Sequence, residues 1–236
     1  IMDLGTIALG VRRGASELLH TSFFAVAKRR WSRPAMADST GQALTYGRAL
    51  VASLLLGRVI RRRTEGQPRV GLLLPASVGG ALANIATLSA GRVPVNLNFT
   101  IGHDAMDAAI VQAGIRTVLT SRTFIAKAAI GERPDMVFLE DLRKDITGVQ
   151  KVLALLEARL LPLRLLARRH GGRGLSADAL ATIIFSSGST GVPKGVMISH
   201  RNVLANVDAL AQIFPMTTDD GFMGVLPFFR SFGLTG

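Results

Sequence analysis

The sequence predicts an α/β fold in which mostly parallel sheets are flanked by helices. Two observations predict it. Short, continuous apolar segments alternate with segments of helical periodicity, which is typical of buried parallel strands joined by helices. In addition, 48% of the 236 residues are hydrophobic, so the chain can bury the core of one domain or of two subdomains.

The elements are expected in the following order. Residues 1–21 form a lead-in, and a helix follows over residues 22–29. The turn at Asp38–Gly41 predicts a short strand pair within residues 33–44, and Thr45 is a favourable N-cap for a helix that continues to about Arg63. Beyond it we expect strands at residues 69–74, 93–97, 116–120 and 135–139, and helices at residues 77–90, 103–114 and 121–130.

Residues 70–91 carry no charge, and this length would suffice for a membrane span. Pro75, Gly79, Gly80 and Asn84 argue against one. We therefore expect a buried strand followed by a buried helix.

Residues 149–169 form a helix rich in leucine and arginine, which Pro162 interrupts. Two interpretations stay open: a connecting helix on the domain surface, or an interfacial helix on anionic lipid. This basic helix closes a first α/β subdomain, expected over residues 22–178.

Residues 179–236 open with the apolar strand 181–185 and the run Ser186–Gly195. Glycines let backbone amides converge on a phosphate, hydroxyls add donors, and Lys194 adds charge. The common P-loop does not fit, because Pro193 precedes the lysine and a second strand follows at residues 196–198. A ligand-free hairpin is the alternative, but an ordinary hairpin needs only two to five loop residues.

The net charge is +12. A positive charge of this size could serve binding to anionic lipid, to an acidic carrier protein or to nucleic acid. It could also belong to an ordinary solvated surface without a partner. A single Trp and a single Tyr argue against nucleic acid. The absence of cysteine excludes disulfides and thiol catalysis, and the four scattered histidines show no metal-ligand spacing, so we expect no metal ligands in this chain.

The segment Ser186–His200 resembles the phosphate loop of the adenylate-forming (AMP-binding) superfamily. The stretch Leu226–Thr235 resembles a motif of its fatty-acid-activating branch, and Asn96–Thr100 and Phe138–Leu142 are similar to acyl-carrier-protein synthetases that are paired with an acyltransferase.

The resemblance implies an incomplete large N-terminal domain of an adenylate-forming enzyme, with residues 179–236 as the phosphate-loop module. The implied reaction activates a fatty acid with ATP to acyl-AMP and transfers the acyl group to a thiol of acyl carrier protein or coenzyme A. Mg²⁺ is implied too, with its usual glutamate ligand expected beyond Gly236. An isolated N-terminal portion would not complete catalysis. The expected location is the cytoplasm, with contact at the inner face of the membrane left open.

The implied roles fall into three sets. The phosphate-binding residues are Ser186, Ser187, Gly188, Ser189, Thr190, Gly191 and Lys194. Thr190 and Lys194 are the catalytic candidates. The acyl and thiol channel would be lined by Phe229, Arg230, Ser231 and Gly233.

Two further residues bear on the site. Arg230 stands where the resemblance implies the histidine of the fatty-acid-activating branch, so it could pair with the fatty carboxylate or obstruct the channel. His200 is expected to be structural, capping the helix that follows and tying it to the loop.

Two alternative functions stay open. The chain could belong to a non-catalytic homologue that binds nucleotide or lipid, or it could be an amino-acid-activating domain.

Overall fold

A computed structural model describes residues 17–186, 193–214, 217, 220–230 and 233–234. Its centre is a four-stranded parallel sheet of order β4-β3-β5-β6. The strands are β3 (Arg69–Leu72), β4 (Val93–Asn96), β5 (Val118–Thr120) and β6 (Met136–Phe138). Each lies within a predicted strand segment, and the predicted α/β class is confirmed.

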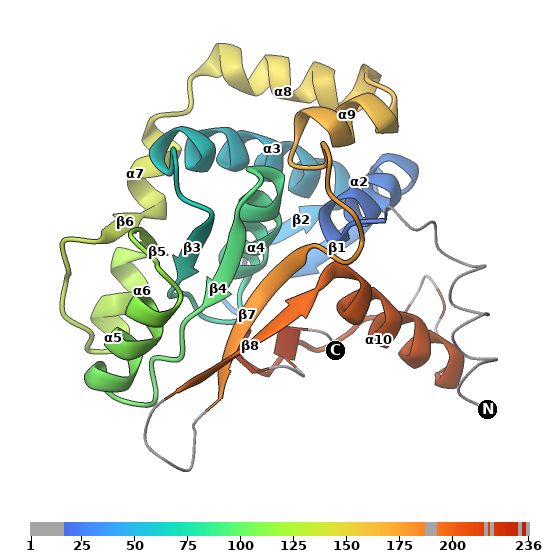
Figure 1. Ribbon diagram of the computed structural model, residues 1–236. Helices are drawn as coiled ribbons and strands as arrows, with labels where there is room; N and C mark the ends of the chain where they lie inside the picture. Colours follow the sequence, from blue (N-terminus) through green and yellow to red (C-terminus); the bar gives the residue numbers. More distant parts are fainter. Residues whose placement is uncertain (1–16, 187–192, 215–216, 218–219, 231–232, 235–236) are drawn as a thin grey trace.

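Helices cover both faces of this sheet (Figure 1). The side chains of β5 show how the two layers arise, because successive residues of a strand face opposite sides. Leu119 lies in a core cluster with Ile60 and Ala86, whereas Val118 lies in another with Met106. The first layer contains α3 (Tyr46–Arg63) and α4 (Val78–Ser89), and the second contains α5 (His103–Gln112) and α6 (Arg122–Lys127).

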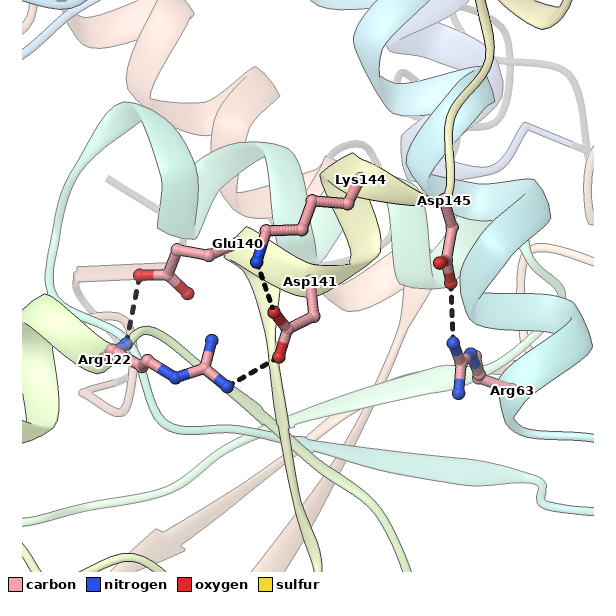
Figure 2. A network of polar contacts seen from close by, with 6 residues as sticks. All are labelled: Arg63, Arg122, Glu140, Asp141, Lys144 and Asp145. Carbon is pink, nitrogen blue, oxygen red and sulfur yellow. Dashed lines mark hydrogen bonds and ion pairs between the residues drawn. The ribbon is translucent and has the colours of Figure 1, made fainter.

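One short helix, α7 (Leu139–Lys144), was not predicted. It is held by polar contacts on two sides (Figure 2). Glu140 accepts hydrogen bonds from the Ser121 hydroxyl and the Arg122 amide, and Asp141 pairs with the Arg122 guanidinium at 2.7 Å. Asp145, just after the helix, pairs with Arg63 at 2.7 Å. The network fastens the end of β6 to α6 and to α3.

The N-terminal elements pack beside α3. Residues 1–16 lie outside the described residues, and α2 (Leu19–Arg29) begins three residues earlier than predicted, within the expected lead-in. The expected strand pair is antiparallel, formed by β1 (Pro34–Ala37) and β2 (Ala43–Thr45). Thr45 is the predicted N-cap of α3, and its side chain accepts from the Arg48 amide at 3.4 Å.

The uncharged segment 70–91 divides into β3 and α4, as expected. Val70 and Leu73 are completely buried, as are Ala83 and Ala86 of the helix. In the part of the chain that the structure describes, no helix combines the length and apolar character needed to cross a membrane.

The leucine- and arginine-rich segment forms two helices, α8 (Gly148–Leu160) and α9 (Leu163–Arg169), which are separated at Pro162 as predicted. Both lie on the outer side of α2 and α3 (Figure 1). The division of the chain near residue 178 stays a prediction.

The last elements are β7 (Leu180–Ser186), β8 (Lys194–Ser199) and α10 (His200–Ile213). β7 and β8 form an antiparallel hairpin, and β7 lies beside β4, where the Thr182 hydroxyl donates to the Pro94 carbonyl at 2.8 Å. β7 is buried, but β8 exposes Val196 and Met197 at 52% and 71%.

Candidate functional site

The β7–β8 hairpin carries the two described ends of the predicted phosphate loop. Ser186 pairs with Lys194 across the hairpin, and the Ser186 hydroxyl donates to the Lys194 carbonyl at 3.4 Å. The predicted phosphate ligands Ser187, Gly188, Ser189, Thr190 and Gly191 lie outside the described residues. Their roles therefore stay predictions.

Lys194 is the first residue of β8, so the strand begins two residues before the predicted segment 196–198. Its side chain is exposed, while Pro193 before it is buried. The buried proline anchors the chain where the strand starts. A primary ammonium group fixed at the base of a loop suits binding of an anion, since it supplies a compact charge with three donors.

Position 195 of this hairpin leaves little room for a side chain. Gly195 lies opposite Phe185. A Cβ atom on Gly195 would lie 3.1 Å from a ring carbon of Phe185 and 3.2 Å from a methyl of Ile183. The absence of a side chain therefore lets the Phe185 ring pack down on β8 beside the loop.

A second segment, 226–230, lies over the carboxyl ends of β3 and β4. Phe229 is 4% exposed, and its ring meets Phe99 edge-on at 5.2 Å between centroids. Phe228 packs on the first turn of α4, where a Cβ on Gly80 would lie 3.0 Å from its ring. Ligands of open parallel sheets bind at the carboxyl ends of the strands.

Phe99 and Gly80 belong to this site, and the sequence interpretation assigned neither of them a role there. Each of the two residues follows the carboxyl end of a strand in the sequence, and this position could have indicated a role at the site. Phe99 also borders a cavity of about 100 Å³ that is lined by Gly102, His103, Met106 and residues 128–130. This volume is below the roughly 300–1,000 Å³ of common ligand pockets, so these walls alone do not enclose a fatty acyl chain.

The structure describes three of the four predicted channel residues. Phe229 is buried, Arg230 is exposed, and Ser231 lies outside the described residues. Gly233 approaches the Leu226 and Pro227 carbonyls so closely that any Cβ would collide with them. Their roles in an acyl or thiol channel stay predictions.

His200 is structural, as expected, but its contacts differ from the prediction. Ser199 is the N-cap of α10, and its hydroxyl accepts from the Asn202 amide at 3.2 Å. His200 is instead 1% exposed, and its Nδ1 accepts from the Leu19 amide at 3.2 Å. Burial lowers the pKa of His200 to about 4. It therefore ties α10 to α2 rather than to the loop.

Within the described ranges, no three histidine, aspartate or glutamate side chains are grouped so that they could hold a metal ion.

The comparisons with known proteins agree on the family. A family model described as AMP-binding enzyme matches residues 23–236. Peroxisomal OPC-8:0-CoA ligase 1 of Arabidopsis thaliana is 28% identical over 206 residues, which are 83% of this chain and 36% of the ligase. Nonribosomal peptide synthetase 7 of Aspergillus fumigatus is 25% identical over 211 residues, which are 89% of this chain and 8% of the synthetase. The chain thus spans a minor part of both relatives.

Solved structures share the fold at lower identity. O-succinylbenzoate coenzyme A synthetase of Bacillus subtilis, in complex with AMP, has a TM-score of 0.70 at 19% identity, over 93% of this chain and 52% of that one. VinN in complex with 3-methylaspartate has a TM-score of 0.71 at 19% identity, over 93% of this chain and 59% of that one. The sequence match over residues 23–236, together with this shared fold, places the chain in the AMP-binding enzyme family.

Proposed function

We propose that the protein is an AMP-forming acid–thiol ligase that activates a fatty acid. One observation carries the proposal. The Phe228–Phe229 segment, which resembles the fatty-acid branch, packs at the carboxyl ends of β3 and β4. The hairpin that carries Ser186 and Lys194 continues the same sheet region beyond β4. An apolar segment and an anion-binding loop would thus serve one site.

The proposed chemistry has two steps. A carboxylate oxygen of the acid attacks the α-phosphorus of ATP, the bond to the bridging oxygen of the β-phosphate breaks, and pyrophosphate leaves. A thiol of acyl carrier protein or coenzyme A then attacks the acyl carbon, its proton is lost, and AMP leaves. Negative charge grows on the leaving pyrophosphate in the first step, so donors fixed beside that group accelerate it most.

In this scheme the residues of the chain bind and orient. The Lys194 ammonium and the Ser186 hydroxyl stand at the two ends of the loop, where they would contact phosphate oxygens. Thr190 and the loop glycines would add donors between them. Magnesium, when bound, would neutralise part of the phosphate charge beside these donors.

An amino-acid-activating domain is a second candidate, because peptide synthetases are among the relatives. Tyrocidine synthase 3 of Brevibacillus parabrevis, for example, is 27% identical over 188 residues, which are 79% of this chain and 3% of the synthase. Leu226–Thr235 favours the fatty-acid branch. Carrier protein as acceptor and a cytoplasmic location are parts of the proposal.

The deciding experiment is ATP–pyrophosphate exchange by the full-length protein with a panel of fatty acids and amino acids. We expect exchange that requires a fatty acid and that falls at least about tenfold in Lys194→Ala, because one charge-assisted contact is lost. The matched control is Lys127→Ala, because Lys127 is an exposed residue of α6. This variant should show normal exchange.

Three other results would overturn parts of the proposal. If exchange depended on an amino acid, the proposed substrate would change from a fatty acid to an amino acid. Normal exchange in Lys194→Ala would remove the role of that lysine. No exchange with any acid, from a folded protein, would favour a binding module that holds nucleotide or lipid without catalysis.

A further inference from the structure

Helix α8 exposes a row of large apolar side chains to solvent. Five of them recur at the spacing of one helical face and are 48–71% exposed: Val149, Val152, Leu153, Leu156 and Leu160. We call these five residues the α8 stripe. Scattered apolar residues on a surface are ordinary, but a contiguous row of this kind marks an interaction site.

The opposite side of α8 holds the helix to the protein. Ala154 and Ala158 are completely buried, and the Ala158 carbonyl accepts from the Lys28 ammonium at 2.7 Å. Because these residues face α3 and α2, the α8 stripe points away from the body. Figure 1 shows α8 as the outermost helix of this side of the molecule.

A basic groove runs beside the stripe. Arg58, Arg61 and Arg62 of α3, together with Gln150 of α8, line a groove of about 190 Å³ between the two helices. We call it the arginine groove. Arg62 is exposed, and burial lowers the pKa of Arg58 but leaves the group charged. Guanidinium groups bind phosphate oxygens through paired N–H donors.

The exposed charged side chains of residues 146–177 are all basic. Within residues 146–177 the only acidic residue is Glu157. Its carboxylate is 8% exposed and already contacts Arg58, Arg169 and His170. The same residues include six basic side chains: Lys151, Arg159, Arg164, Arg168, Arg169 and Arg173. No exposed carboxylate of this segment opposes an anionic surface.

We propose that the α8 stripe and the arginine groove form a docking surface for an anionic phospholipid bilayer. The helix of 13 residues, about 20 Å long, lies in the plane of the interface with its leucines among the acyl chains. The arginines then meet the lipid phosphates. The surface lies on α8 and α3, away from the β7–β8 hairpin, so the inference does not depend on the proposed reaction.

The exposed apolar row of α8 beside the arginines of α3 favours a membrane over other partners. An acidic carrier protein or a nucleic acid would use the basic side chains and leave the stripe in water. A bilayer that contains phosphatidylglycerol satisfies both, because the apolar side chains leave water and the exposed Arg61 and Arg62 guanidinium groups gain phosphate partners.

The test is co-sedimentation of the full-length protein with vesicles of phosphatidylcholine alone and with 30% phosphatidylglycerol, at low and high salt. We expect binding to the anionic vesicles that weakens with salt. Leu153→Gln with Leu156→Gln should weaken it about tenfold or more, since two buried side chains are lost. Arg62→Gln should weaken it about fivefold, the usual contribution of one basic residue.

Matched controls lie elsewhere on the surface. Val111→Gln and Ile213→Gln alter side chains that are 78% and 71% exposed on α5 and α10. Lys127→Gln removes one positive charge from α6. All three should bind vesicles like the unaltered protein, and circular dichroism should confirm that every variant is folded.

Equal binding to neutral and anionic vesicles would overturn the proposal, as would normal binding by the folded Leu153→Gln, Leu156→Gln variant. If that variant instead changed the oligomeric state in sedimentation while vesicle binding persisted, the surface would be a contact between copies of the chain, and the proposal would fail. ATP–pyrophosphate exchange without lipid reports the proposed reaction separately.

Discussion

The Nδ1 atom of His200 accepts a hydrogen bond from the backbone amide of Leu19, 181 residues earlier in the chain, at 3.2 Å. The His200 ring also lies 6.0 Å from the ring of His20, which is 1% exposed. Two buried histidines thus join the start of α10 to the start of α2. Because α10 follows β8 directly, this contact fixes the end of the β7–β8 hairpin that lies away from Lys194.

The first prediction concerns the pH dependence of stability. Burial, and then the charge of His200, lowers the pKa of His20 to about 3. An unfolded histidine titrates near its ordinary value of about 6.5, so the unfolded chain binds the proton first as the pH falls. The contribution of neutral His20 to the free energy of unfolding is therefore fully present above about pH 7, and it is lost progressively as the pH falls below about 6.5.

At pH 5 this loss is about 2 kcal/mol for His20. The free energy of unfolding, measured with denaturant, should therefore fall by about 2 kcal/mol less between pH 7 and pH 5 in His20→Phe than in the unaltered protein. The matched control is His103→Phe, because His103 is exposed at the start of α5. An unchanged pH profile in His20→Phe would contradict the prediction.

A second prediction concerns the turn between β1 and β2. The Asp38 carboxylate accepts from the Val78 amide at 2.9 Å, at the first turn of α4. Thr40 donates to the other oxygen and is the main cause that lowers the pKa of Asp38. Asp38→Ala should destabilise the protein by about 1 kcal/mol, as loss of a helix cap does.

The same substitution should also reach the candidate site, because the first turn of α4 carries Gly80 beneath Phe228. We expect a lower Tm in Asp38→Ala and a near-normal Tm in Glu65→Ala, where an exposed carboxylate is removed instead. Equal melting temperatures for Asp38→Ala and the unaltered protein would show that the contact adds nothing.

The parallel sheet was predictable because its strands are short, continuous apolar segments between helices. Helix α7 was not, because it has only six residues and no side-chain cap, and because its contacts come from elsewhere. Arg63 and Arg122 stabilise it, and neither is adjacent in sequence. Periodicity over six residues does not reveal such tertiary support.

The candidate site shows the same division. Ser186 and Lys194 could be predicted as phosphate-binding residues because the local sequence pattern carries the resemblance. The contact of Phe229 with Phe99 joins residues 130 positions apart, and no local pattern encodes it. Likewise, the sequence marked His200 as structural, but only the fold shows that Leu19 is its partner.

A third prediction concerns Arg230, the departure from the family pattern. Its side chain is exposed, one residue after buried Phe229. Arg230→Ala should therefore keep the Tm within about 1 °C, as surface substitutions do. If the guanidinium attracts the fatty carboxylate, KM for the acid should rise severalfold in exchange assays, while Arg230→Lys should stay near normal.

An obstructing arginine would give the opposite result, because Arg230→Ala would then lower KM or raise kcat. The two variants thus decide between attraction and obstruction. The outcome also shows whether Arg230→His, which restores the family residue, improves the enzyme.

The last prediction concerns the glycine that closes the hairpin. Gly195→Ala places a methyl group 3.1 Å from the Phe185 ring and 3.2 Å from Ile183. Because both neighbours are buried and have little room to give way, we expect about 1–3 kcal/mol of destabilisation with a fall in exchange activity. Gly131→Ala is the matched control, since no atom lies within 4 Å of its Cβ position. Thermal melts and exchange rates of the two variants measure both effects. If Gly195→Ala matched Gly131→Ala in stability and in exchange, the close contact with Phe185 would matter neither to the hairpin nor to the candidate site.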